Sequence, residues 1–248
     1  MPAALYDYCR KGKHSPIKVG GGFLLPTDQQ TQAHLLCKDC EDILSKGGEA
    51  WIANKLATWE RTFPLFEILT KMPPDFDEDG MAVYFAAKNP EIKVGKLIHF
   101  ALGLFWKASV HSWSGRKKIP RIELGPYSES IRKWLLGESQ FPQSVYLIAA
   151  ASRPQRAQIT MSDPYEGVRR EWHTHFVHVP GLLFTLAVGK TVDESIRVFC
   201  IHNSPGNPVT ISDSLTDSLE QVMVKAFRRS RKTQAYLRAM ANHDRERR

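Results

Sequence analysis

The fold is decided by the stretch GKLIHFALGLFWKASVHSW, residues 95–113. Its side chains are apolar on nearly every face of a helix, and a helix that is apolar all round belongs at the centre of a core. The longest apolar segment within it, residues 97–106, is far shorter than the roughly 20 residues that span a membrane. The stretch therefore predicts a buried central helix in a soluble protein without membrane contact.

Further helices are expected on both sides of this stretch. Apolar side chains recur at helical spacing through residues 51–59 and again in FPLFEILTKM, residues 63–72. The segment GPYSESIRKWLLG, residues 125–137, has Pro near its start and Gly at its end, and these residues commonly mark the start and the end of a short helix. Residues 51–140 are therefore predicted to form a helical region.

The hydrophobic pattern changes in residues 143–203. Short runs rich in β-branched and aromatic residues are separated there by Gly, Pro, Asp and Asn, which is typical of strands and turns. The runs are SVYLIAA (144–150), AQITM (157–161), EWHTHFVHV (171–179), LLFTLAVG (182–189) and IRVFCIH (196–202). They predict an antiparallel meander of four or five strands.

A last helix is expected at residues 214–248, because Ser214 and Asp217 form a capping-box-like start. Helices followed by a sheet indicate an α+β fold class. Residues 1–50 are rich in glycine, hold three of the four cysteines and have too few apolar residues to fold alone. We therefore expect a small N-terminal module at 1–50 and an α+β domain at 51–248.

Positive charge is concentrated at the C-terminal end of the chain. Residues 225–248 hold nine Lys or Arg against two acidic residues, which accounts for +7 of the net charge of +8. Such a segment favours phosphate contacts with nucleic acid, or an acidic protein partner. The alternative is the solvated end of an amphipathic helix. The candidate nucleic-acid-binding residues are Lys225, Arg228, Arg229, Arg231, Lys232 and Arg238.

Two of the cysteines have the spacing of a metal-binding or redox motif. Cys37 and Cys40 form C-x-x-C, and four cysteines in a chain of this size suit a reduced compartment, so we expect a cytoplasmic protein. The flanking segments are typical of a loop and a helix, which disfavours a thioredoxin-like site. A structural zinc site would take Cys9 as a third ligand and His14 or His34 as the fourth. The alternative is buried or incidental thiols.

The segment YDYCRKGKHSPIKVGGG, residues 6–22, followed by LLCKDCE, residues 35–41, resembles the treble-clef modules of bacterial HNH endonucleases. The continuation to about residue 52 is similar to a group of uncharacterised bacterial proteins of this kind. The resemblance implies zinc at Cys9, Cys37 and Cys40. It also implies that His14 deprotonates the attacking water and that Glu41 binds or orients a catalytic Mg²⁺ or Mn²⁺.

Several positions depart from the pattern of that family. Tyr6 stands where the first cysteine is expected, and Pro16 follows His14 by two positions instead of three. If His14 is the fourth zinc ligand, it cannot also be the base. One hypothesis is therefore a diverged, metal-dependent endonuclease that acts on DNA or RNA. The alternative is a non-catalytic, zinc-containing binding or scaffold subunit of a bacterial complex, in which the α+β domain is the working part.

Other motifs carry less functional information. Strand alternation places His173 and His175 on one face, where with His202 they would form a second metal site, although a half-exposed strand also needs polar residues at alternate positions. Cys200 is expected to be a small core residue. The chain has no Gly-rich phosphate loop and no nucleophile elbow, so kinase, P-loop and α/β-hydrolase functions have no support.

Overall fold

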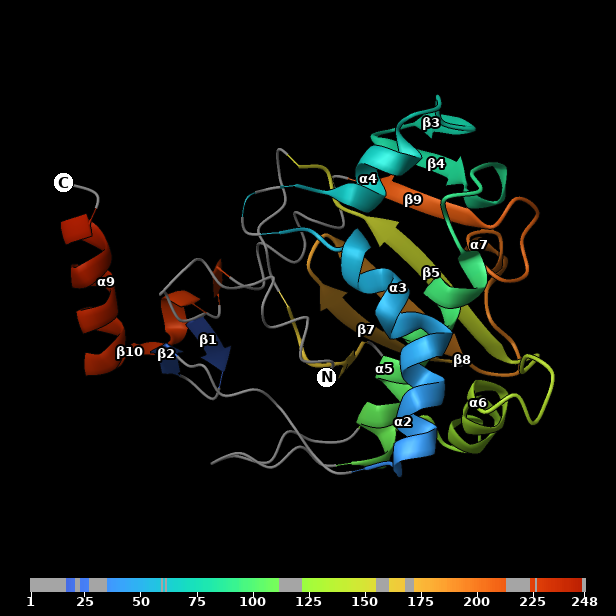
Figure 1. Cartoon of the computed structure of the whole chain (residues 1–248), viewed down its shortest axis with the longest axis horizontal. Coiled ribbons are helices and arrows are strands. Elements are labelled where there is room, and N and C mark those ends of the chain that lie inside the picture. Colours follow the sequence, from blue (N-terminus) through green and yellow to red (C-terminus); the bar gives the residue numbers. More distant parts are fainter. Residues whose placement is uncertain are drawn as a thin grey trace.

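The protein is described from a computed structural model. The structure describes residues 17–20, 23–26, 35–58, 60, 62–111, 122–154, 161–167, 172–212, 224–225 and 227–246. These residues form a body of helices and a seven-stranded sheet, together with a small three-stranded sheet that carries the last helix (Figure 1). The predicted α+β class is confirmed. No described helix is long and apolar enough to cross a lipid bilayer.

The large sheet has the strand order β3-β4-β9-β5-β8-β7-β6. Its strands are β3 (Phe76–Glu78), β4 (Met81–Phe85), β5 (Val145–Ala151), β6 (Tyr165–Glu166), β7 (His173–Val179), β8 (Leu182–Val188) and β9 (Pro208–Ser212). Every neighbouring pair is antiparallel except β5 and β9, which run parallel. The predicted antiparallel meander is therefore only one part of a larger mixed sheet.

Two segments of the predicted meander differ from the structure. Residues 196–202 are not a strand, because Asp193 caps the short helix α7 (Glu194–Arg197) by accepting a hydrogen bond from the backbone N–H of Ser195, and turns follow. Between the predicted meander and the predicted last helix lies β9, for which no strand was predicted and all of whose residues are buried. The predicted strand at 157–161 lies outside the described residues except for Met161, which is not in a strand.

The region predicted to be helical also contains a hairpin. Strands β3 and β4 are joined at Asp79 and Gly80, both with positive φ, which is the backbone of a tight two-residue hairpin turn. The helices of this region are α3 (Ala50–Ile52), α4 (Pro64–Leu69), α5 (Val94–Val110) and α6 (Tyr127–Leu135), with 3-10 turns at Ala53–Lys55 and Ala86–Lys88. The helical prediction for residues 51–140 is therefore wrong at the hairpin.

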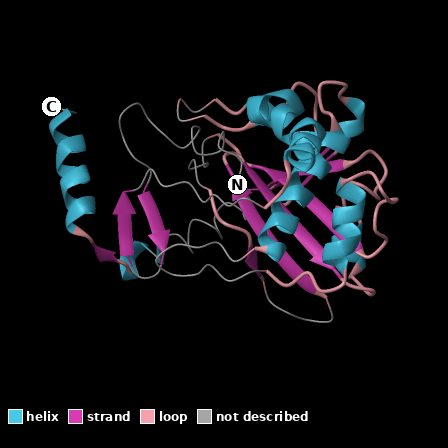
Figure 2. Ribbon diagram, turned by 60° about the horizontal axis from the view of Figure 1, so that its bottom comes forward, coloured by secondary structure: helices cyan, strands magenta, loops and turns pink. Residues whose placement is uncertain are grey.

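Helix α5 lies at the centre of the body, as predicted. Figure 2 shows the helices layered over the strands of the large sheet. Phe100 of α5 meets Phe184 of β8 edge to face, with ring centroids 6.0 Å apart, and both side chains are fully buried. The opposite face of the sheet is covered near α7, where Tyr146 packs with Cys200 in a second, smaller cluster. The central strands β5 and β8 are thus buried on both faces.

The helix that follows the cysteine pair packs against α5. It consists of α2 (Lys38–Leu44), a π-helical turn (Ser45–Glu49) and α3. A Cβ atom at Gly48 would lie 2.5 Å from the carbonyl oxygen of Lys96, so only glycine permits this close crossing. Glu49 on the π-helical turn forms an ion pair of 2.8 Å with the buried Lys107 of α5. The crossing therefore ties the cysteine-bearing helix to the core.

Segments from the N-terminal and C-terminal parts of the chain pair in the small sheet. Strands β1 (Ile17–Gly20) and β2 (Phe23–Pro26) form an antiparallel hairpin, and β10 (Arg231–Lys232) pairs with β2 in parallel. Helix α9 (Gln234–Glu246) packs on β2. We call β1, β2, the helical residues 224–225 and 227–229, β10 and α9 the terminal module; Figure 1 shows its strands and α9 grouped to one side of the large sheet.

The continuous helix predicted for residues 214–248 is interrupted. Residues 224–225 and 227–229 are helical, β10 follows, and α9 then begins at Gln234. Thr233 explains the second start: its hydroxyl accepts a hydrogen bond from the backbone N–H of Tyr236 and donates one to the carbonyl of Leu24. The predicted start at Ser214 lies outside the described residues.

Candidate functional site

The cysteine pair stands at the beginning of α2. Cys37 is the residue that precedes the helix and Cys40 lies one turn further, with its amide and thiol directed toward the Cys37 sulfur. The backbone N–H of Cys40, aided by its thiol, lowers the pKa of Cys37. The pKa of Cys40 is raised because its thiol is the donor to Cys37. The Cys40 thiol is thus within hydrogen-bonding reach of the Cys37 sulfur.

The described residues provide only half of the predicted zinc site. Cys37 is exposed and Cys40 is half-buried, so both thiols are open to further ligands. Two adjacent thiols fit two corners of a tetrahedral zinc site. The predicted partners Cys9, His14 and His34 lie outside the described residues, and within those residues no group of three His, Cys, Asp or Glu is arranged to hold a metal ion.

Glu41, the predicted catalytic carboxylate, is exposed on α2. The contacts of α2 are with the π-helical turn and α5, whereas β2 of the hairpin contacts β1, β10 and α9. The hairpin of the terminal module therefore packs with a helix from the other end of the chain. The HNH-like module stays a prediction, because most of residues 1–34 lie outside the described residues.

All six predicted nucleic-acid-binding residues are exposed on the terminal module. Arg231 and Lys232 lie on β10, and Arg238 lies on α9. The other three lie on the helical residues before β10: Lys225, Arg228 and Arg229. Among the described residues, no acidic side chain forms an ion pair with any of them. The structure therefore gathers cations from several elements on one small unit.

An exposed aromatic ring lies among these cations. Phe227 immediately precedes Arg228 and Arg229, and it meets Tyr236 of α9 edge to face with centroids 6.0 Å apart. Tyr236 is buried, whereas Phe227 remains exposed. An exposed ring beside arginines offers a surface on which a nucleobase can stack.

The histidines of β7 do not form a metal centre in the described structure. His175 is fully buried on the face of the sheet that carries Val177. His202 instead stacks on Phe141, with ring centroids 4.0 Å apart. Burial lowers the pKa of His202 to about 4. His173, the third predicted ligand, is half-buried on β7. The alternative expected from the sequence, a half-exposed strand face, is wrong for His175, because that face of β7 is buried from His175 onward.

Cys200 is a core thiol, as predicted. It is fully buried and donates a hydrogen bond to the carbonyl of Ile196. Burial raises its pKa to about 12, so the thiol stays protonated at neutral pH. It lies in an irregular segment between two turns and not in the predicted strand.

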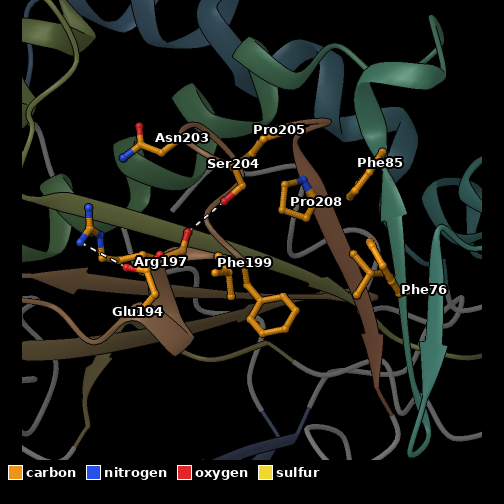
Figure 3. Close-up of a pocket in the computed structure, with 11 residues that line it drawn as sticks. Phe76, Phe85, Glu194, Arg197, Phe199, Asn203, Ser204, Pro205 and Pro208 are labelled. Carbon is orange, nitrogen blue, oxygen red and sulfur yellow. Dashed lines mark hydrogen bonds and ion pairs between the residues drawn. The ribbon is translucent and has the colours of Figure 1, made fainter.

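A groove at the β3 edge of the large sheet was not found from the sequence. Figure 3 shows Phe76 and Phe85 on the strands at one side of it, and Phe199 with Glu194 and Arg197 at the other. Its walls come from residues 76–85 and 194–208, which are far apart in sequence. The Asp-Gly turn at residues 79–80 was the signal for the hairpin, but no local pattern indicated its partner segment.

Comparisons with known proteins give no relative for this chain. No protein-family model matches it. No characterised protein and no solved structure is significantly similar to it.

Proposed function

We propose that this protein binds nucleic acid through its terminal module. The observation that carries the proposal is the set of six exposed cations on that module, which have no acidic partner among the described residues. Cations that contact phosphates release condensed counterions, so they add affinity without reading base sequence. The interaction is therefore electrostatic, salt-dependent and largely independent of sequence.

The test compares two sets of charge removals in the full-length protein. Replacing Arg231, Lys232 and Arg238 by alanine is expected to weaken binding to labelled DNA or RNA by about tenfold or more at low salt. The same change should reduce the slope of log affinity against log salt by roughly 3, because each phosphate contact contributes roughly 0.9. Fluorescence anisotropy across a salt series measures both quantities.

A matched control removes three cations from the body. Lys93, Lys133 and Lys190 are exposed, and their replacement by alanine changes the net charge by the same amount. We expect the control to retain most of the affinity and the salt slope. Equal losses in the two triple variants would show that net charge, and not the terminal module, determines binding.

We further propose that Cys37 and Cys40 hold a structural zinc ion together with Cys9 and either His34 or His14. The exposure and proximity of the two thiols support this assignment. Elemental analysis should find close to one zinc per chain in the wild type and little in the Cys37→Ser/Cys40→Ser variant. A wild-type protein that lacks zinc and has freely titratable thiols at positions 9, 37 and 40 would contradict it.

A metal-dependent endonuclease is the second candidate function. The observation that favours it is the exposed carboxylate of Glu41, directly after Cys40. When bound, Mg²⁺ or Mn²⁺ would supply charge stabilisation at the phosphate, while His14 would take a proton from the attacking water. In this proposal, His14 is not a zinc ligand.

Nuclease assays distinguish the two functions. With Mg²⁺ or Mn²⁺ we expect cleavage of DNA or RNA that is lost in His14→Ala and reduced in Glu41→Gln, with both variants folded by circular dichroism. Cleavage by the His14→Ala variant at the wild-type rate would contradict the catalytic assignment. No cleavage by the wild type, combined with retained binding, would favour the non-catalytic subunit, in which zinc is structural and the α+β body meets protein partners.

A further inference from the structure

The groove beside β3 has a volume of about 440 Å³ and an aromatic lining. Phe76 pairs with Val83 across β3 and β4, and Phe85 pairs with Pro208 across β4 and β9, so these four side chains belong to the same region of the sheet. The wall opposite is formed by the segment from Glu194 to Pro205 (Figure 3). A groove of this size accepts one or two apolar side chains of a ligand.

The strand that borders the groove is an edge strand. β3 pairs only with β4 among the described residues, so the main chain along its other side is free to pair. Phe76 on this strand is 62% exposed, the largest value among the described large apolar side chains that are exposed. An exposed edge strand is a template for an added strand. The groove and the free edge therefore form one continuous surface.

The rim of this surface is acidic. Asp77, Glu78 and Asp79 are exposed, and none forms an ion pair with another described residue. The cation nearest to the groove, Arg197, is already paired with Glu194 at 3.3 Å. The Lys88 ammonium, which lies 5.2 Å from the centre of the Phe85 ring, is paired with Asp75. The uncompensated charge at the rim is therefore negative.

We propose that this edge and groove bind an extended, basic peptide segment of a partner protein. The peptide main chain would pair with β3, and its alternate apolar side chains would lie beside Phe76 in the groove. Its cations, on the opposite face of the added strand, would face Asp77. Strand addition uses main-chain hydrogen bonds for affinity and side-chain pockets for specificity. A second copy fits less well, because edge-to-edge pairing of two β3 strands would bring like charges together.

The test uses a labelled heptapeptide of alternating Lys and Leu, blocked at both ends, and its counterpart with Glu in place of Lys. The full-length protein should bind the Lys peptide at least about tenfold more tightly than the Glu peptide, with an affinity that falls as salt rises. Methylation of alternate backbone nitrogens in the Lys peptide should weaken binding by a similar factor, because it removes the donors that pair with β3.

Two protein variants locate the site. Phe76→Ser should weaken binding of the Lys peptide about tenfold, since it removes the apolar contact of an exposed side chain without opening the core. Tyr165→Ser is the matched control, because Tyr165 is 42% exposed on β6 at the other edge of the same sheet. Equal binding of the two peptides, or equal effects of the two variants, would overturn the proposal.

Two further measurements exclude other occupants. Sedimentation should show that the wild type does not self-associate through the groove. Self-association that Phe76→Ser abolishes would assign the groove to a second copy and contradict the proposal. The triple alanine variant of the terminal module should bind the Lys peptide as the wild type does. Loss of peptide binding in that variant would show that the peptide acts at a place other than the groove.

Discussion

The two sheets of this protein are built in opposite ways. The seven-stranded sheet lies against α5 in a continuous apolar core, and its central strands β5 and β8 are almost completely buried. In the terminal module, Leu24 and Tyr236 are the buried large side chains among the described residues, while Phe227 and Leu237 are exposed. The side chains that the structure describes are thus mostly buried in the core of the body and mostly exposed in the module.

Charge follows the same division. Residues 225–248 carry +7 of the net +8, so the rest of the chain is close to neutral. In the body, described cations such as Lys107 and Arg132 have acidic partners. A unit with many unpaired cations is costly for folding but well suited to a polyanion, because the ligand supplies the missing countercharge. Among the described residues, the packed core therefore belongs to one sheet and the concentration of unpaired cations to the other.

The largest expected effect tests the packing of the body. Phe184→Ala removes a fully buried ring from the contact between β8 and α5, so we expect the free energy of unfolding to fall by about 3–5 kcal/mol. Urea denaturation followed by tryptophan fluorescence measures it. Leu24→Ala in the terminal module is the matched control, and we expect it to leave this transition unchanged. An equal shift in both variants would mean that the two sheets unfold as one unit.

The next effect tests the ion pair that ties the cysteine-bearing helix to α5. Lys107→Ala leaves the Glu49 carboxylate without its partner in a largely buried position, which should destabilise the body by about 3 kcal/mol. The matched control is the exposed pair Lys71 and Glu91, where Lys71→Ala should give no measurable change. If Lys107→Ala lowers the free energy of unfolding as little as Lys71→Ala does, water must solvate the buried pair.

The same comparison explains which elements could be predicted from the sequence. Helix α5 and strands β5, β7 and β8 are long runs whose apolar pattern is decided by burial in one core, so their type was predicted correctly. Strand β9 was missed because its five residues are buried by neighbours distant in sequence and not by a pattern of their own. Residues 196–202 have strand-forming side chains, but the cap at Asp193 favours a helical turn.

The candidate sites show the same limit. The exposure of the basic residues was predictable, because a run of charges avoids the core whatever the topology. The pairing of β2 with β10 was not, since it joins Phe23 to Arg231 and no local pattern encodes a contact of that sequence separation. The groove at β3 could not be predicted either, because Phe76 and Phe199, which both line it, are far apart in sequence.

A third effect concerns pH and applies to the body. His178 is buried, with its Nε2 atom 3.1 Å from the Tyr165 hydroxyl, and burial lowers its pKa to about 4. In the unfolded chain the imidazole takes up a proton near pH 6.5. The contribution of His178 is therefore fully present above pH 6.5 and is lost as the pH falls toward 4, by about 3 kcal/mol.

Denaturant titrations at several pH values between 7 and 4 check this expectation. His178→Gln should flatten the loss of stability over that range, because glutamine does not titrate but still offers a donor to Tyr165. Burial lowers the pKa of His202 to about 4 as well, so adding His202→Gln should flatten the profile further. A pH profile identical to that of the wild type in the double variant would assign the acid sensitivity to other groups.

The smallest effect tests the contacts that hold the terminal module together. Thr233→Val removes both the cap of α9 and the hydrogen bond to the carbonyl of Leu24, while keeping the side-chain shape. The loss should be about 1 kcal/mol and should be confined to the module. Hydrogen exchange of the α9 amides should become faster while that of β5 and β8 is unchanged. Thr233→Ser, which retains the hydroxyl, should restore protection.

The same variants connect the order of α9 to binding, since the module presents the cations. Weaker nucleic-acid binding in Thr233→Val but not in Thr233→Ser would link the order of α9 to recognition. Faster exchange throughout the body would instead show that the two sheets are coupled.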